Sequence, residues 1–550
     1  MKRLPFFTFL LTFFFFHIAT AQKIIYSDPG KEAFNRVKYN IITKHDDKLL
    51  VYKALYFHTF LQGGNSINRR QTTSNNSTLT EFDPSGLHPN NFIEQSTLCI
   101  YDSNMHVITE KPLPIPRGST GIHFLVYDDF FYTFYQYLHN HTIYCMALKL
   151  NMDGDMVGSS IKMDSTHIPE VQEQSQIYSV INSEDQQQIL LFRTNIYHQP
   201  TRIKAVWFDK DLHPAQNKDL SLYVEASQYL SEYQVDNEGN FIFVGMNGRA
   251  KAHDPAQAAL FTIPAHEDSI RTTYFVPASI SVDNVHLLID NRHKRYILTS
   301  FYSRRPEAAI EGLFCLVHDA ERRSAEKGSL TVLSDDMLRE IKKNGIKISL
   351  DDYYIQDLHL RRNGSFTIGA QELGVTPEHE IADRWLYLPA EKESIAKEFA
   401  WYDPYENDQY YPWTSWRKIG MFMLNRYSFM SRGTLIISFD STGVEEWTNV
   451  IRTPQHNMAN AALGYKTIIA NGLLYFLYNA RLHQRTFLTA RGIDAEGTLD
   501  TDSRFKEDLA LRDQDNAYEY FPRLAKVVDA GEIIVPCRKG GYFCLAKINF

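Results

Sequence analysis

The sequence predicts an all-β protein, a β-propeller of four-stranded antiparallel blades, and three observations support this. Polar turns between two strand-like runs recur along the whole chain. A second kind of turn, opened by Asp or Asn, follows within most units. The aromatic share is 13%, with 32 Tyr and 35 Phe, and such side chains favour strands over helices.

The first kind of turn occurs eight times, each time before an apolar, β-branched or aromatic run. These turns lie at 45–48, 128–129, 183–185, 236–239, 290–292, 362–364, 471–472 and 529–531. Each predicts the connection between the first and second strands of a blade. Eight blades are therefore favoured, with seven as the alternative if two units are misread.

The second kind of turn begins with an Asp or Asn at the end of a strand, because this short side chain can accept hydrogen bonds from backbone N–H groups two residues on. Its members are Asp102, Asn151, Asp209, Asp319, Asp440 and Asp494, with a fainter one near 266–268. Two strand pairs per unit predict a four-stranded blade. The chain ends at Phe550 before the last unit has its outermost strand, so we expect the strand at 23–26 to complete that blade and close the ring.

An alternative architecture is two separate β domains joined near 325–350. There, the stretch "SDDMLREIKKNGI" is typical of a short helix capped by Ser334. The propeller prediction instead treats residues 22–550 as one domain.

Residues 1–21 are typical of a secretory signal peptide. Lys2 and Arg3 precede an apolar run to Ile18, and small residues lead to a cleavage site after Ala21. No later stretch has the roughly 20 apolar residues of a membrane-spanning helix. We therefore expect an exported protein, periplasmic or extracellular.

The net charge argues against two classes of binding partner. A net charge of −8 without long charged blocks argues against nucleic acid or an anionic membrane as partner.

Cys99, Cys145 and Cys315 lie in apolar runs and are expected as buried thiols. In "CRKGGYFC", a two-residue turn at Gly540 and Gly541 would place Cys537 opposite Cys544, which makes a disulfide possible.

Two long insertions interrupt the repeat, at about 58–96 and 374–430, each between a second and a third strand. The first is rich in Asn, Ser and Thr. The second holds four of the six tryptophans. Its candidate binding residues are Trp385, Trp401, Trp413, Trp416, Tyr405, Tyr410 and Tyr411. These rings could form a recognition surface for a protein or glycan, or the insertion's own small core.

Catalytic and metal-binding motifs are sparse. A glycan-acting enzyme needs two carboxyl groups, and candidates cluster at the entry to the second insertion: Glu372, Glu378, Glu380 and Asp383. A sialidase-like site also needs arginines, which Arg69, Arg70, Arg304, Arg305 and Arg384 could supply. No spacing predicts a metal site, a nucleophile elbow or a phosphate-binding loop, so we expect no metal and no cofactor.

The stretch "SFDSTGVEEW" at 438–447 resembles two known signatures. It is one residue too long between Asp440 and Gly443 for a sialidase Asp-box, and one too short before Thr442 for the tryptophan-docking repeat of quinoproteins. We interpret it as the turn between the third and fourth strands of the sixth blade. Asp440 caps this turn, and Trp447 packs between blades.

The segments "GTLIISFDSTGVEEWTNVIRTPQ", "LLYFLYNAR" and "EIIVPCRKGGYFCLAKINF" resemble the last blades of exported propeller proteins common in Bacteroidetes-type bacteria. The resemblance implies export and a propeller, and it supplies no catalytic residues.

Together these features predict an exported monomer that binds a protein or a glycan through the face carrying both insertions. The alternative is a sialidase- or glycosidase-like enzyme that uses carboxylates near the channel mouth.

Overall fold

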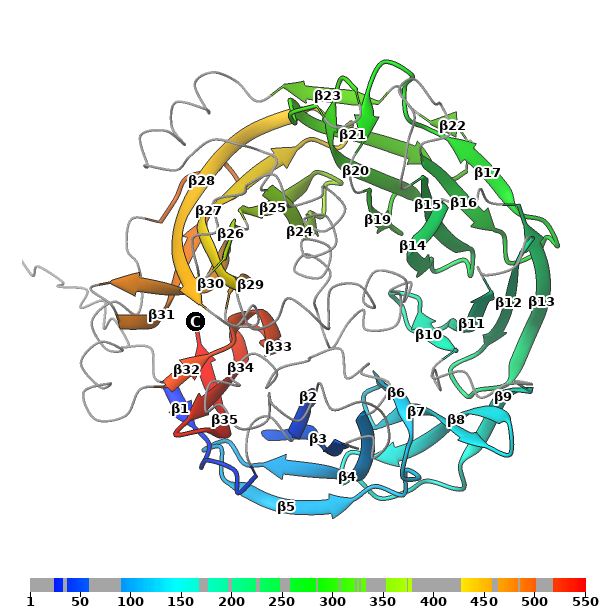
Figure 1. Ribbon diagram of the computed structural model, residues 1–550, viewed down its shortest axis with the longest axis vertical. Helices are drawn as coiled ribbons and strands as arrows, with labels where there is room; N and C mark the ends of the chain where they lie inside the picture. The colour runs from blue at the N-terminus through cyan, green and yellow to red at the C-terminus, as the bar shows by residue number, and fades with distance from the viewer. Residues whose placement is uncertain are drawn as a thin grey trace, which may run out of the picture.

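Eight antiparallel sheets follow one another around a central axis in the computed structural model, which confirms the eight-bladed propeller (Figure 1). The structure describes residues 24–32, 37–58, 91–167, 177–195, 200–223, 228–247, 258–282, 285–305, 308–321, 324–325, 328–332, 353–372, 374–377, 427–457, 463–482, 485–500 and 518–550. Its sheets form one ring, in place of the alternative of two separate β domains. The helix predicted after Ser334 lies outside the described residues.

The first four blades each contain four strands in chain order. Blade 1 consists of β2 (Val37–His45), β3 (Lys48–His58), β4 (Asn91–Tyr101) and β5 (Val107–Pro112). Blade 2 consists of β6 (Thr120–Val126), β7 (Phe130–His139), β8 (Thr142–Asn151) and β9 (Ile161–His167). Blade 3 consists of β10 (Ser179–Asn182), β11 (Ile189–Asn195), β12 (Thr201–Phe208) and β13 (Pro214–Leu222). Blade 4 consists of β14 (Gln228–Val235), β15 (Phe241–Asn247), β16 (Ala258–Ile263) and β17 (Arg271–Tyr274).

The other four blades are less regular. In blade 5, β18 (Ser281–Val282) and β19 (His286–Asp290) both pair with β20 (Arg295–Ser303), and β22 (Ser324–Ala325) and β23 (Ser329–Val332) both pair with β21 (Gly312–Asp319). Blade 6 consists of β24 (Tyr353–Leu360), β25 (Phe366–Glu372), β26 (Gly374–Pro377), β27 (Tyr427–Phe439) and β28 (Glu445–Asn457). Blade 7 has three described strands, β29 (Tyr465–Ala470), β30 (Leu473–Leu482) and β31 (Arg485–Ile493), and a single bridge joins Ile493 to Leu499 where a fourth would begin.

Blade 8 combines the two ends of the chain. Its segments are β32 (Tyr518–Tyr520), a 3-10 turn η5 (Pro522–Leu524), β33 (Lys526–Asp529), β34 (Glu532–Lys539), β35 (Tyr542–Asn549) and, as the outermost strand, β1 (Ile24–Tyr26). The N-terminal strand is antiparallel to β35, with Ile24 opposite Ile548 and Tyr26 opposite Ala546. The predicted ring closure is thereby confirmed.

In blades 1 to 4 the first strand lies nearest the axis and the fourth lies on the rim (Figure 1). All eight turns of the first kind connect first to second strands, as predicted. They therefore share one face of the ring, named here the first-turn face. Connections between second and third strands lie on the opposite face, named here the insertion face.

Five of the predicted turns opened by Asp or Asn share one hydrogen-bond pattern, in which the side-chain Oδ1 accepts from the backbone N–H groups two and four residues on. The pattern occurs at Asp102, Asn151, Asp209, Asp440 and Asp494. At Asp440 these bonds measure 2.8 Å to Thr442 N and 2.9 Å to Val444 N.

The "SFDSTGVEEW" stretch is the predicted turn between β27 and β28. Gly443 has a φ of +83°, which strains any residue with a Cβ. Trp447 Nε1 donates to the carbonyl oxygen of Ala495 in blade 7 at 2.9 Å. Its indole covers Gly497, where a Cβ would meet the ring. This motif is therefore a contact between two blades.

The apolar core is divided among the interfaces between blades. Among the described residues, eight clusters of buried apolar side chains each join two successive blades. The cluster between blades 8 and 1 contains Tyr39 and Val51 on one side and Ile534, Phe543 and Leu545 on the other. Since a sheet buries both faces only between two neighbours, the ring must close for every blade to be covered.

All five cysteines are buried and free. Cys99, Cys145 and Cys315 lie in strands, as predicted. The predicted hairpin also forms, because Gly540 and Gly541 both have positive φ and Cys537 is paired directly with Cys544. The two Sγ atoms lie 2.9 Å apart. The disulfide between them stays a prediction.

The two insertions are shorter at their ends than predicted. Strands β4, β26 and β27 include residues 91–96, 374–377 and 427–430, so the intervening segments are 59–90 and 378–426. Strand pairing continues into these ends because their apolar and β-branched residues extend the ladders of blades 1 and 6.

Removal of β1 should destabilise the ring and expose the edge of β35. A chain that begins at Ser27 is expected to lose about 3 kcal/mol of unfolding free energy relative to one that begins at Gln22, because three half-buried side chains and their ladder are lost. Thermal unfolding and light scattering measure both effects. Equal melting temperatures and equal association of the two chains would contradict closure by β1.

Candidate functional site

One predicted catalytic residue, Glu372, lies within the described structure. It is the last residue of β25, and its side chain is 1% exposed. Glu372 Oε1 accepts a 3.0 Å hydrogen bond from Arg432 Nε, and Oε2 accepts another of 3.0 Å from the Arg432 backbone N–H. This carboxylate thus joins β25 to β27, and its role as an acid or base stays a prediction.

The other predicted site residues lie outside the described part of the chain. They are Glu378, Glu380, Asp383, Trp385, Trp401, Trp413, Trp416, Tyr405, Tyr410 and Tyr411. Of the arginines proposed to converge, Arg304 pairs with Glu311 at 2.9 Å and Arg305 is exposed in the same loop of blade 5. Arg69, Arg70 and Arg384 are likewise outside the described residues.

Metal-binding groupings are absent among the described residues: no three His, Cys, Asp or Glu side chains are placed to hold an ion. The two histidines at 139 and 141 flank the tip of the β7–β8 hairpin, where Asn140 and His141 have positive φ. The 151–155 segment is an Asn-capped turn.

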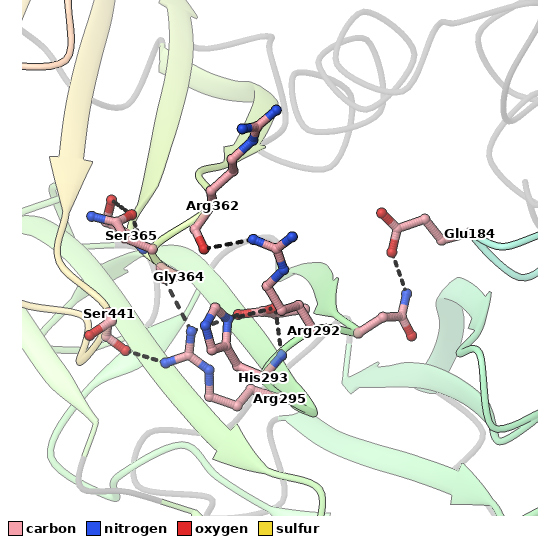
Figure 2. Close-up of polar contacts among 11 residues, drawn as sticks. Glu184, Arg292, His293, Arg295, Arg362, Gly364, Ser365 and Ser441 are labelled. Carbon is pink, nitrogen blue, oxygen red and sulfur yellow. Dashed lines mark hydrogen bonds and ion pairs between the residues drawn. The ribbon is translucent and has the colours of Figure 1, made fainter.

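The first turns of blades 3 to 6 are connected to one another on the first-turn face. Figure 2 shows the contacts of the turns of blades 5 and 6. Asn237 Oδ1 accepts from Asp185 N at 3.1 Å, and Asn291 Oδ1 accepts from Asn237 N at 2.9 Å. Asn291 Nδ2 donates to Glu184 Oε2 at 2.7 Å, which links blades 3 and 5 past blade 4. Backbone and amide groups thus hold these turn tips in a fixed arrangement on the first-turn face.

A group of basic side chains lies in the turns of blades 5 and 6, and it is named here the basic turn cluster: Arg292, His293, Arg295 and Arg362. Asp290, whose side chain is fully buried, holds part of it. Its Oδ2 accepts from Arg295 NH2 at 2.6 Å and lies 2.8 Å from His293 Nδ1. Burial alone would raise the pKa of Asp290, but hydrogen bonds from Arg295 and His293 hold it below its ordinary value.

Arg295 fixes the neighbouring blade to this carboxylate. Its NH1 donates to the carbonyl oxygen of Ser441 at 2.6 Å, and its NH2 donates to that of Gly364 at 3.2 Å. Gly364 has a φ of +83° and no space for a Cβ beside Arg295 and His293. Arg292 lies above them, and its NH1 donates to the carbonyl oxygen of Arg362 at 3.3 Å (Figure 2).

Sequence reasoning treated 290–292 and 362–364 as turn signals and assigned them no function. A signal was nevertheless present, because "DNRHKR" at 290–295 and "RRNG" at 361–364 are the most basic of the eight first turns and belong to adjacent blades. Their meeting depends on ring geometry, which the spacing of residues along the chain does not encode.

A second polar feature lies on the inner wall, between the first strands of blades 4 and 5. Glu232 has a φ of +55° at an irregularity in the pairing of β14 with β15. Its Oε2 accepts from Leu287 N at 2.9 Å, and its Oε1 lies 3.8 Å from His286 Nδ1. The two side chains are 7% and 10% exposed.

Burial determines the charge of this pair. It raises the pKa of Glu232 to about 8 and lowers the pKa of His286 to about 4, so both are neutral at pH 7. Ionisable groups whose pKa values are shifted by burial also occur at active sites. The pair also serves as a structural contact, since Glu232 connects the inner strands of two blades.

Comparisons with known proteins assign no family and no activity to this chain. No family model matches the sequence, and no curated protein matches it, so the resemblance to exported propellers depends on the quoted segments. A solved prolyl endopeptidase matches 92% of the chain at 7% identity with a TM-score of 0.40, and the chain spans 55% of that protein's length. The β-propeller domain of the trilobed protease from Pyrococcus furiosus matches 87% of the chain and 94% of its own length, at 8% identity and a TM-score of 0.34.

An oligogalacturonate lyase solved with manganese matches 88% of the chain and 97% of its own length, at 8% identity and a TM-score of 0.36. At these identities and TM-scores the neighbours assign no activity to this chain. Within the described residues, none of the helical segments has the length and apolar character needed to cross a membrane.

The Glu232 carboxyl should make stability depend on pH. Its pKa is about 8 in the folded chain against an ordinary 4.5, so the folded state binds the proton more tightly. Stability is therefore full below the lower value and is lost as the pH rises through about 8. With about 1.4 kcal/mol per pKa unit, the unfolding free energy should fall by a few kcal/mol over this window.

Glu232→Gln should abolish this decline, because the amide does not ionise. Urea unfolding at several pH values measures it, and Glu496→Gln, an exposed change in a turn of blade 7, is the matched control. The same slope in wild type and Glu232→Gln would show that Glu232 does not carry the effect.

Proposed function

We propose that this chain is an exported propeller that binds a protein or a glycan through its insertion face. The observation that carries the proposal is topological. The segments 59–90 and 378–426 both connect a second to a third strand, so both leave the ring on one face. The second of them contains four of the six tryptophans, whose rigid rings suit a recognition surface.

Binding is favoured over catalysis because buried carboxylates such as those of Glu372 and Asp290 are paired with cations of the scaffold. Glu372 is paired with Arg432, Asp290 with Arg295, and Asp164 with Lys204 at 2.8 Å. Each pair joins strands or blades to one another. Buried charges that are paired in this way support the scaffold on which a binding surface is displayed.

The alternative is a glycan-acting enzyme, and Glu232 is the observation that favours it. A carboxyl with a pKa of about 8 has the protonation state of a general acid at neutral pH. Such an enzyme needs a second carboxylate roughly 5 to 10 Å away. Glu372, Glu378, Glu380 and Asp383 are the candidates for that role.

Export rests on the first 21 residues. We propose that they act as a signal peptide cut after Ala21, which would place the propeller in the periplasm or outside the cell. The resemblance to exported Bacteroidetes-type propellers agrees with this location. We propose no cofactor and a monomeric chain.

A binding screen of residues 22–550 against glycan and protein arrays tests the proposal. A chain lacking 379–426 and a Trp401→Ala, Trp413→Ala, Trp416→Ala variant should both lose the ligand, because the aromatic surface is removed, while their melting temperatures stay near that of the parent. A chain lacking 60–89 is the matched control for deletion of a loop on the same face.

Retention of every interaction by both folded variants would refute the insertion as the binding surface. The same preparations should be assayed for release of reducing sugar from the bound glycans. Release that is abolished by Glu232→Gln or Glu372→Gln would favour the enzyme.

A further inference from the structure

We propose that Arg292 and Arg362 form a second binding site, on the first-turn face, for the carboxylate of a short peptide that also carries a positive charge. This site is independent of the insertion face and goes beyond the function proposed above.

Arg292 and Arg362 differ from the other cations in and beside the first turns. Among the described residues there, each of the others contacts a carboxylate: Lys44 with Glu532, Lys48 with Asp153, Lys294 with Glu321, Arg295 with Asp290, and Arg361 with Glu446. Arg292 donates to a carbonyl oxygen, which leaves its charge uncompensated, and the Arg362 guanidinium is exposed. The guanidinium groups of these two neighbouring turns are therefore able to bind an external anion.

The two arginines are placed on a fixed base, which lowers the entropic cost of binding. Asn291, the residue before Arg292, is held by Asn237 and Glu184. The turn of Arg362 is held through the Gly364 carbonyl by Arg295, which is itself fixed by buried Asp290. Figure 2 shows both guanidinium groups projecting from these turns on the same side. Such prior ordering improves affinity without additional contacts.

Exposed carboxylates also lie in the first turns of blades 2 and 3. Asp128 and Asp129 in blade 2 and Glu184 and Asp185 in blade 3 are exposed at their turn tips. Glu184 lies 2.7 Å from Asn291, so negative and positive groups are separated by only a short span. A polyanion that covered the first-turn face would be repelled by these carboxylates. A ligand with one negative and one positive group would instead be oriented by them.

A peptide is the ligand class that carries a carboxylate and an ammonium group on one short chain. Its carboxylate would accept hydrogen bonds from Arg292 and Arg362, and its ammonium group would face Glu184, which contacts the turn of Arg292 through Asn291. Each arginine contact is a charge-assisted hydrogen bond, so loss of both should weaken binding at least about tenfold.

Isothermal titration of the 22–550 chain with three capped tetrapeptides tests this site. The probes are Lys-Gly-Gly-Glu, Glu-Gly-Gly-Glu and Lys-Gly-Gly-Lys. The first should bind most tightly, and its affinity should fall as salt is raised, because salt screens both charges. Arg292→Gln with Arg362→Gln should weaken it at least about tenfold. Glu184→Gln retains an acceptor for Asn291 and should remove the preference for the first probe over the second.

Arg305→Gln is the matched control, since Arg305 is also exposed and belongs to the loop after β20 on the insertion face. It should leave all three affinities unchanged. The proposal is overturned if no probe binds saturably, if the double arginine variant binds the first probe as the Arg305→Gln control does, or if Glu-Gly-Gly-Glu binds most tightly to the unaltered chain. Deletion of 379–426 should not change these affinities, so this test is separate from that of the insertion face.

Discussion

Closure of the ring is the constraint on which the rest of the structure depends. Each blade is a small sheet whose two faces are both apolar, and a single blade would leave most of that surface in water. The buried clusters lie between blades, so a blade is stable only when it has a neighbour on each side. The cluster between blades 8 and 1 and the pairing of β1 with β35 meet this requirement at the point where the chain begins and ends.

Closure also creates the surfaces on which function depends. Successive turns of an antiparallel sheet alternate between its two ends. The connections from first to second strands therefore lie on one face of the ring, and those from second to third strands lie on the other. The first-turn face is rigid, because hydrogen bonds of backbone and side-chain groups link the turns of four blades. The insertion face receives the long segments from blades 1 and 6. The described ends of both long connections, at β3 and β4 and at β26 and β27, thus lie on the opposite side of the scaffold from the linked first turns.

The sequence was sufficient to predict the features that depend on local chemistry. Asp440, Gly443 and Trp447 were assigned to the correct turn, since capping and positive φ follow from residue type. Eight units and closure by residues near 24–26 followed from counting such turns. Contacts set by ring geometry were not predictable: Glu184 meets Asn291 across 107 positions of sequence, and Glu372 meets Arg432 across 60. The raised pKa of Glu232 likewise depends on burial between strands that only the folded ring brings together.

Hydrogen exchange followed by mass spectrometry tests closure of the ring most directly. If β1 is the outer strand of blade 8, the amides of 24–26 should be protected and should open together with those of 542–549, because the two strands share one ladder. Exchange of 24–26 at the rate of an unstructured peptide, while 542–549 and the other blades remain protected, would contradict the account.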